Sequence, residues 1–257
     1  TTRLLWATAV LVGMAGCGEV PAEEAIEADS PADAAVAAAH SNQYSVTLNG
    51  TNEYFLSTGI PAGITGNFTV AAWIKCSATL AANAAVAGIY NSAAATTLYY
   101  MLVAGGATDV LRATAQNTVA RSASGTTTVC DDTWHFVASV FVPGSTTRTV
   151  YWSNGTANLQ TVTATTGAAT WSATSARFAV GAQGDSTIAE YFNGKIDEVA
   201  VWNTNLSTAS LEAVFDAADA AGAAWNYSAT TGSYLETANL TNWWRFGDGT
   251  SDDYSTA

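Results

Sequence analysis

The sequence is poor in charge, and in positive charge above all. Of its 257 residues, 11% are charged, against roughly 25% in an ordinary soluble protein. Only 8 are Lys or Arg whereas 21 are Asp or Glu, which gives a formal net charge of −13 at pH 7. Binding to nucleic acid depends on clustered basic side chains that neutralise phosphates, and the chain has no such cluster. We therefore expect no nucleic-acid partner.

Long apolar runs are also missing. No run approaches the roughly 18 residues that a transmembrane helix needs. Even so, 49% of the residues are hydrophobic, and the chain has 9 Trp and 10 Tyr. This content excludes a disordered acidic chain and is enough for a substantial hydrophobic core.

The first 42 residues differ in composition from the rest. Residues 4–15 are apolar, about the length of a signal-peptide core, and small residues precede Cys17. This arrangement resembles a bacterial lipobox, in which Cys17 would carry the lipid. The alternatives are an ordinary secretory signal or a frayed helix. We predict a signal peptide at 1–17, and since no Met begins the chain, we expect further residues before it.

Residues 18–42 read as a tether. They carry six acidic residues, no Lys or Arg and no aromatic residue. Such a segment has few large apolar side chains to bury, and its charged side chains favour contact with water. We therefore expect an exported protein of the bacterial cell envelope or surface, either lipid-anchored or extracellular, whose only membrane contact would be a lipid anchor at Cys17.

From residue 43 onward, short alternating apolar segments recur with turn residues between them, the pattern of a β-sandwich. In the segment 68–76, alternate side chains share one face and Trp73 lies on the other. The segment 134–141 is apolar on both faces, as in a central strand. Asn154-Gly155 is a strong hairpin signal between two further strands. Additional strands are expected at 44–48, 98–103, 109–115, 148–153, 159–165, 177–181 and 195–202. With no long helix between them, the class is all-β and antiparallel.

One short helix is expected after the last core strand. Ser207 is a good N-cap, and Leu206 and Leu211 have the spacing of a hydrophobic staple. Apolar residues then follow at helical spacing up to Ala218, and Gly222 is a suitable C-terminal residue. We interpret this helix as structural.

Two cysteines remain if Cys17 is lipid-modified. Cys76 ends one apolar strand and Cys130 precedes another. If these strands pair antiparallel, both cysteines fall at the same end. We predict a Cys76–Cys130 disulfide, as expected in an exported domain; two free thiols are the alternative.

Several segments resemble the laminin G-like, concanavalin A-like jelly roll. The most specific is 191–207 (YFNGKIDEVAVWNTNLS), which is also similar to a strand of pentraxins. The resemblance implies a two-sheet antiparallel jelly-roll sandwich over 43–234. In pentraxins a disulfide joins the same strand pair, at positions matching Ala71 and Val137. The other matching segments are 48–54 (LNGTNEY), 68–75 (FTVAAWIK), 134–138 (WHFVA) and 151–155 (YWSNG).

Two local features accompany the resemblance. Ile196, Val199 and Val201 cannot all share one face of a regular strand, so either both faces are buried or a bulge occurs near Asp197-Glu198. Residues 235–257 resemble the linker strand of modular surface and phage-tail proteins. We expect them to be a C-terminal strand or the start of a following segment that is truncated here.

Catalytic patterns are missing. Glycoside hydrolases of this fold use a Glu-x-Asp-x-Glu strand, in which alternate carboxylates point into the cleft. Asp197-Glu198 and Asp131-Asp132 are adjacent pairs, which face opposite ways on a regular strand. His135 lies in an apolar strand and reads as a strand residue with a satisfied imidazole rather than a catalytic base. We predict no enzymatic activity.

Calcium is the candidate ion, since it takes oxygen ligands. The segment 181–186 resembles the pentraxin calcium loop, which implies Asp185 as a carboxylate ligand and Gln183 where that family has an acid. Asp197 and Asn49 are alternative oxygen donors. The competing interpretation is a polar loop without metal.

Sugar recognition combines aromatic faces with hydrogen bonds. Trp171, Tyr191, Trp225 and Tyr227 lie in polar, loop-like surroundings and are candidate sugar contacts, with edge packing as the alternative. We predict a non-catalytic surface adhesion module that recognises a glycan or glycoprotein. The alternatives are a structural or assembly module of a surface appendage or phage-tail-like protein, and a divergent glycoside hydrolase.

Overall fold

The structure is a computed structural model that describes most of the chain from residue 45 onward. The predicted signal peptide, the tether, Cys17, Trp171 and Gly222 lie outside the described residues. No helix of the described part is long and apolar enough to cross a membrane. The described residues are 45–77, 80, 82–93, 96–104, 108–115, 122–155, 158–168, 174–221, 225–246 and 253–255.

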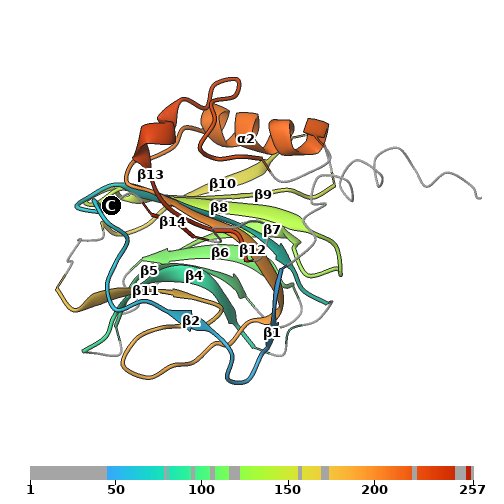
Figure 1. The fold of residues 1–257 in the computed structure, drawn as a ribbon. Coiled ribbons are helices and arrows are strands. Elements are labelled where there is room, and N and C mark those ends of the chain that lie inside the picture. Colours follow the sequence, from blue (N-terminus) through green and yellow to red (C-terminus); the bar gives the residue numbers. More distant parts are fainter. Residues whose placement is uncertain are drawn as a thin grey trace, which may run out of the picture.

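Two antiparallel sheets form the body (Figure 1). The first, sheet A, has β12 near its middle, with β1 (Val46–Asn49) paired to β12 beside the main path. Its other strands follow the order β10 (Gln160–Thr165), β9 (Thr147–Trp152), β8 (His135–Phe141), β3 (Phe68–Lys75), β12 (Asn193–Trp202), β13 (Leu240–Trp244) and β14 (Asp253–Ser255).

The second, sheet B, packs against one face of sheet A. Its strands are β2 (Phe55–Leu56), β11 (Ala176–Val180), β4 (Ala84–Asn91), β5 (Thr96–Ala104), β6 (Val110–Ala115) and β7 (Ser122–Thr128), in that order. The predicted all-β, two-sheet antiparallel jelly-roll sandwich is confirmed.

Alternation along β3 builds two cores. Phe68 and Val70 are fully buried between the sheets, together with Trp152 of β9. Trp73 points to the opposite face of sheet A, where it packs against Phe215 of the helix. Sheet A is therefore buried on both faces, which explains why the segment 134–141 is apolar throughout.

The helix α2 (Thr208–Ala221) covers the outer face of sheet A (Figure 1). Ser207 Oγ accepts a hydrogen bond from the Ser210 N–H at 3.0 Å, which confirms the predicted N-cap. Leu206 and Leu211 are both buried beneath it. The helix was expected after the last core strand, but further strands of sheet A follow it: a 3₁₀ turn η1 (Glu236–Asn239) leads from the helix layer into β13.

The predicted disulfide is present. Cys76 and Cys130 are bonded, with their Cα atoms 4.6 Å apart. The bridge lies at one end of the β3–β8 pair, where the Asp132 N–H also donates to the Cys76 carbonyl at 2.9 Å. In the β3–β8 register, Ala71 is opposite Ala138. The bridge is therefore further towards the strand ends than the pentraxin positions.

Strand β12 shows both expected alternatives: residues 196–202 are all buried, and the strand contains a bulge. Its register with β3 shifts between Asp197 and Ala200, and Glu198 adopts a φ of 50°. The extra residue lets Ile196 and Val199 both enter the core between the sheets. The same bulge turns Glu198 to the outer face beside Asp197.

Candidate functional site

The loop that joins β11 to β12 forms one rim of the sandwich. Its ends are held together by a hydrogen bond from the Phe192 N–H to the Gly181 carbonyl at 2.8 Å. The turn after β1 lies against it, since the Gly50 N–H donates to the Phe192 carbonyl at 3.0 Å. We call residues 49–54, Asn83 and residues 181–192 the rim.

Two aromatic rings meet at the rim. Tyr54 and Tyr191 are half-buried, with ring centroids 6.0 Å apart and planes at 49°. Partly exposed rings of this kind offer C–H-binding faces to a ligand. The predicted site residue Tyr191 therefore lies on the surface, with its hydroxyl 3.4 Å from the Ile188 carbonyl.

Glu190, next to Tyr191, has a strained backbone and an unsatisfied carboxylate oxygen. Its φ is 49°, a left-handed conformation uncommon for residues other than glycine. Asn83 donates to Glu190 Oε1 at 3.3 Å, whereas Oε2 is buried and has no partner among the described residues. Strain of this kind gathers at ligand sites, so Glu190 joins Tyr191 as a candidate contact.

The predicted calcium ligands Gln183 and Asp185 contact each other in the rim. Gln183 Nε2 donates to Asp185 Oδ2, and the Thr187 N–H donates to Oδ1 at 2.9 Å. Arg177 Nε donates to the Gly184 carbonyl at 2.6 Å, and the same guanidinium binds the Asp185 carbonyl. Each carboxylate oxygen of Asp185 thus accepts one N–H donor, and the Arg177 guanidinium holds the backbone of the loop.

The two alternative oxygen donors do not meet. β1 does pair with β12, but Asn49 lies opposite Asn193, four residues before Asp197. The Asn49 side chain caps its own turn by accepting from the Thr51 N–H at 2.8 Å. Asp197 lies opposite Trp73 and is fully buried. No group of three or more His, Cys, Asp or Glu side chains suited to a metal occurs in the described chain.

The pair Asp197-Glu198 corrects the expectation that the two carboxylates face opposite ways. Because of the bulge, both lie beneath the helix layer, and both are 0% exposed. The indole N–H of Trp243 donates to Glu198 Oε2, and Arg245 lies 3.6 Å from Oε1. Burial, reinforced by the nearby negative charge of Glu198, raises the pKa of the Tyr227 hydroxyl well above its ordinary value. These carboxylates are inaccessible to a substrate in the folded protein.

The other predicted aromatic contacts lie on the helix side. Tyr227 is 1% exposed and packs edge-on against Trp202, which corrects the expectation of a polar loop position, because a buried ring has no face to offer. Trp225 is half-buried against the same core, and its indole N–H donates to the Ala229 carbonyl at 3.3 Å. Trp171 lies outside the described residues.

His135 is a satisfied strand residue, as predicted. The ring is 3% exposed. Its Nδ1 lies 2.6 Å from the Ser153 carbonyl, and its Nε2 lies 2.9 Å from Asp131 Oδ1. Both ring nitrogens are therefore engaged inside the protein.

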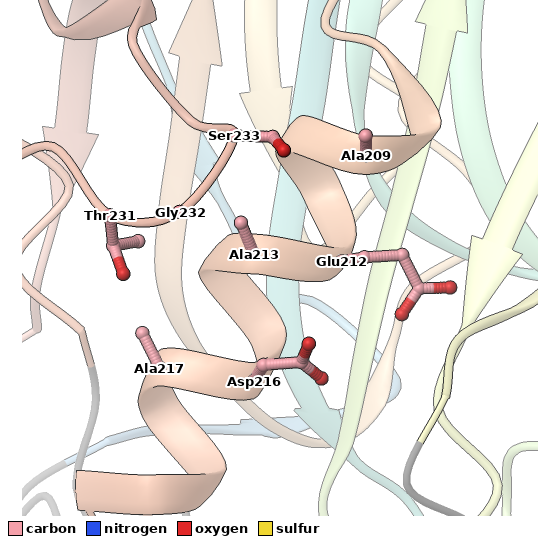
Figure 2. Close-up of a pocket in the computed structure, with 8 residues that line it drawn as sticks. All are labelled: Ala209, Glu212, Ala213, Asp216, Ala217, Thr231, Gly232 and Ser233. Atoms are coloured by element: carbon pink, nitrogen blue, oxygen red, sulfur yellow. The ribbon is translucent and has the colours of Figure 1, made fainter.

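A hollow of about 630 Å³ lies between helix α2 and the turn 231–233 (Figure 2). Its floor is a row of alanines on the helix, and Gly232 approaches so closely that a Cβ there would lie 3.0 Å from the Ala213 Cβ. Figure 2 shows Glu212 and Asp216 pointing away from this turn. The hollow has no aromatic side chain in its lining, so we interpret it as the seam where the turn packs on the helix.

Residues 49–212 match the sequence model of a laminin G-like family of the concanavalin A-like lectin/glucanases superfamily. The chain belongs to this family. No curated protein has a significantly similar sequence.

Solved structures show the same fold at low sequence identity. One is a protein from Bacteroides ovatus that its name assigns to carbohydrate binding. It has a TM-score of 0.54 and 14% sequence identity, over 81% of this chain and 54% of that chain. A native heptameric SAP-like pentraxin from Limulus polyphemus has a TM-score of 0.52 and 13% sequence identity, over 81% of this chain and 93% of that chain. The enzymatically active domain of a bacteriophage CBA120 tailspike protein has a TM-score of 0.53 and 10% sequence identity, over 80% of this chain and 30% of that chain. This laminin G-like domain thus spans only about half of the first of these proteins.

Proposed function

We propose that this laminin G-like domain is a non-catalytic module that binds a glycan or glycoprotein at the rim. The observation that carries the proposal is the meeting of Tyr54 and Tyr191 beside the strained Glu190. Aromatic faces take the C–H surface of a pyranose, while carboxylate and amide groups bind its hydroxyls. The carbohydrate-binding description of a protein with the same fold supports this reading.

A glycan array tests the proposal with the wild type, Tyr191→Ala and a matched control, Leu235→Ala. Leu235 is 69% exposed and lies on the helix side, so its truncation removes an exposed apolar side chain without touching the rim. We expect wild type and Leu235→Ala to bind the same glycans and Tyr191→Ala to lose at least tenfold in affinity. Equal binding by all three proteins would place recognition outside the rim. No binding of any glycan by the wild type would contradict the proposed function.

Calcium assistance stays a prediction from the family resemblance. It requires the Gln183 amide to turn, so that its oxygen rather than its nitrogen faces Asp185. A rise of the melting temperature in millimolar calcium, lost in Asp185→Asn, would support it. The same melting temperature in calcium and in chelator would remove it.

A structural or assembly module is the second candidate. The likeness to the tailspike domain supports it only at the level of fold. Ordered higher-mass species in size-exclusion chromatography, together with no glycan binding, would favour it over the first.

We further propose export to the cell surface, with a lipid anchor at Cys17. The Cys76–Cys130 disulfide fits an oxidising compartment. Mass spectrometry of the protein purified from a bacterial envelope tests the anchor: a lipid-modified Cys17 at the new N-terminus supports it, and cleavage elsewhere contradicts it.

A further inference from the structure

A second hollow lies at the side of the sandwich, away from the helix layer. The chain that leaves β2 runs along this side on its way to β3 (Figure 1). Its residues 57–62 form one wall, and Phe178, Asn242 and Trp244 form the other. Together they enclose about 250 Å³. We call this hollow the side pocket.

The first wall is fixed in place by hydrogen bonds to Phe178. The Ser57 N–H donates to the Phe178 carbonyl at 2.9 Å, and the Phe178 N–H donates to the Gly59 carbonyl at 3.1 Å and to Ser57 Oγ at 2.9 Å. The wall therefore needs no ordering when a ligand binds, which lowers the entropic cost of binding.

The second wall combines an aromatic ring and an amide. Asn242 and Trp244 are two residues apart on β13, so both point to the same face of sheet A. The Trp244 ring stacks on Phe178, with centroids 5.1 Å apart and planes at 8°. This stacking fixes the indole at the edge of the core, where it is half-buried.

One atom of the Asn242 amide has no partner in the described part of the chain. Its Oδ1 is buried and makes no hydrogen bond with the described residues. A buried acceptor without a partner costs about 1–3 kcal/mol. A ligand in the pocket that carries a donor would satisfy this oxygen.

An apolar margin adjoins the pocket. Phe55, two residues before Ser57 in its wall, is 44% exposed and pairs with Val180 on the inner face of sheet B, whereas Leu56 pairs with Ala179 and faces the other way. Phe55 is one of three large hydrophobic side chains exposed in the described chain. The Phe55 ring lies 4.9 Å from that of Phe246, two residues after Trp244. Phe55 and Phe246 therefore give one edge of the pocket an apolar margin.

We propose that the side pocket binds a single pyranose ring that carries a methyl group, either an N-acetylhexosamine or a 6-deoxyhexose. The cavity is smaller than the roughly 300–1,000 Å³ of drug-sized ligand sites, which suits one sugar ring rather than an oligosaccharide. Trp244 takes the C–H face, Asn242 binds a hydroxyl or amide N–H, and the methyl group lies on the apolar margin. This inference rests on the proposed glycan-binding function but concerns a site separate from the rim.

Titrations followed by NMR test the site with N-acetylglucosamine, fucose and glucose as probes. Asn242→Ala removes the amide, and Thr58→Trp fills the pocket from an exposed position. Thr230→Trp adds the same bulk at an exposed position outside the pocket. We expect millimolar binding of N-acetylglucosamine or fucose by the wild type and Thr230→Trp, about tenfold weaker binding by Asn242→Ala because one hydrogen bond is lost, and no binding by Thr58→Trp.

The outcomes separate the two sites. Loss of array binding in Tyr191→Ala, with unchanged monosaccharide binding in Asn242→Ala and Thr58→Trp, would leave the proposed function standing and overturn the side pocket. Binding of glucose as tight as that of both methyl-bearing sugars would overturn the assigned ligand class. Light scattering adds one more outcome: self-association that Thr58→Trp abolishes would make a second copy of this chain the occupant and overturn the proposal.

Discussion

The Cys76–Cys130 bridge allows a quantitative prediction about stability. The two residues are 54 positions apart in the sequence. For a closed loop of this length, the chain-entropy relation gives a loss of about 14 cal/mol/K in the unfolded state, or about 4 kcal/mol at 25 °C. We therefore expect the double variant Cys76→Ala/Cys130→Ala to lose about 4 kcal/mol of unfolding free energy. In a domain of this size, that corresponds to a fall of roughly 8–16 °C in melting temperature.

Urea denaturation and thermal melting, each with and without reductant, measure the effect. Reduced wild type keeps both sulfur atoms but loses the bond, so it separates the bridge from the packing of two buried side chains. Reductant should lower the stability of the wild type and leave the double variant unchanged. A wild-type melting temperature that reductant does not alter would refute the entropic reasoning, and a thiol assay that finds two free cysteines would refute the bridge itself.

Three further predictions concern individual polar side chains. Glu198→Ala leaves the Trp243 indole N–H without its acceptor and should cost about 2–3 kcal/mol in urea denaturation; a change below about 0.5 kcal/mol would contradict the contact. Burial raises the pKa of Asp131, but hydrogen bonds from Thr133 and His135 outweigh it and leave that pKa below its ordinary value. Stability from Asp131 is thus present above about pH 4 and lost as the pH falls further, so melting of Asp131→Asn should depend less on acid than melting of the wild type. Burial raises the pKa of Tyr99, so its stabilisation holds below about pH 10 and declines above it; ultraviolet titration should show this phenol ionising only as the protein unfolds, and Tyr99→Phe removes that part of the alkaline signal.

Much of the fold was predictable because local chemistry and burial agree. The pairing of β9 with β10, the N-cap Ser207 and the two faces of the segment 68–76 all follow from local sequence, although the connection between β9 and β10 covers residues 153–159 rather than the two-residue turn that Asn154-Gly155 predicts. The strands β4 and β7 were missed. β4 (AAVAGIYN) is buried throughout and β7 (SASGTTT) has few apolar side chains, so neither shows clear alternation.

The position of β13 shows a different limit. Residues 235–257 were expected to be a C-terminal strand or the start of a following segment, beyond the sandwich. Residues 240–244 do form a strand, but it pairs with β12 inside sheet A and carries Asn242 and Trp244 to the side of the sandwich. Pairing between segments about 40 residues apart depends on the helix layer between them, and no local pattern encodes it.

The rim was predicted in part. Tyr191, Gln183 and Asp185 were identified from the family resemblance, and the structure brings them into one loop with Tyr54 and Glu190. The partner of Asp185 was not predictable, because Arg177 lies on β11 and reaches the loop only after the chain folds back. A φ of 49° at Glu190 has no sequence signal, since it is imposed by the loop closure around it.

The adjacent acids of β12 bear on the glycosidase alternative. A retaining glycosidase needs two carboxyl groups about 5 Å apart across an open cleft. Asp197 and Glu198 lie side by side, but both are fully buried under Tyr227 and Trp243. A substrate could reach them only if the helix layer opened, and that would expose the outer core. We therefore expect no reducing-sugar release from β-glucans by the folded protein. Release that Glu198→Gln abolishes, in a variant that still melts cooperatively, would show that the layer opens and that this buried pair is a reaction centre.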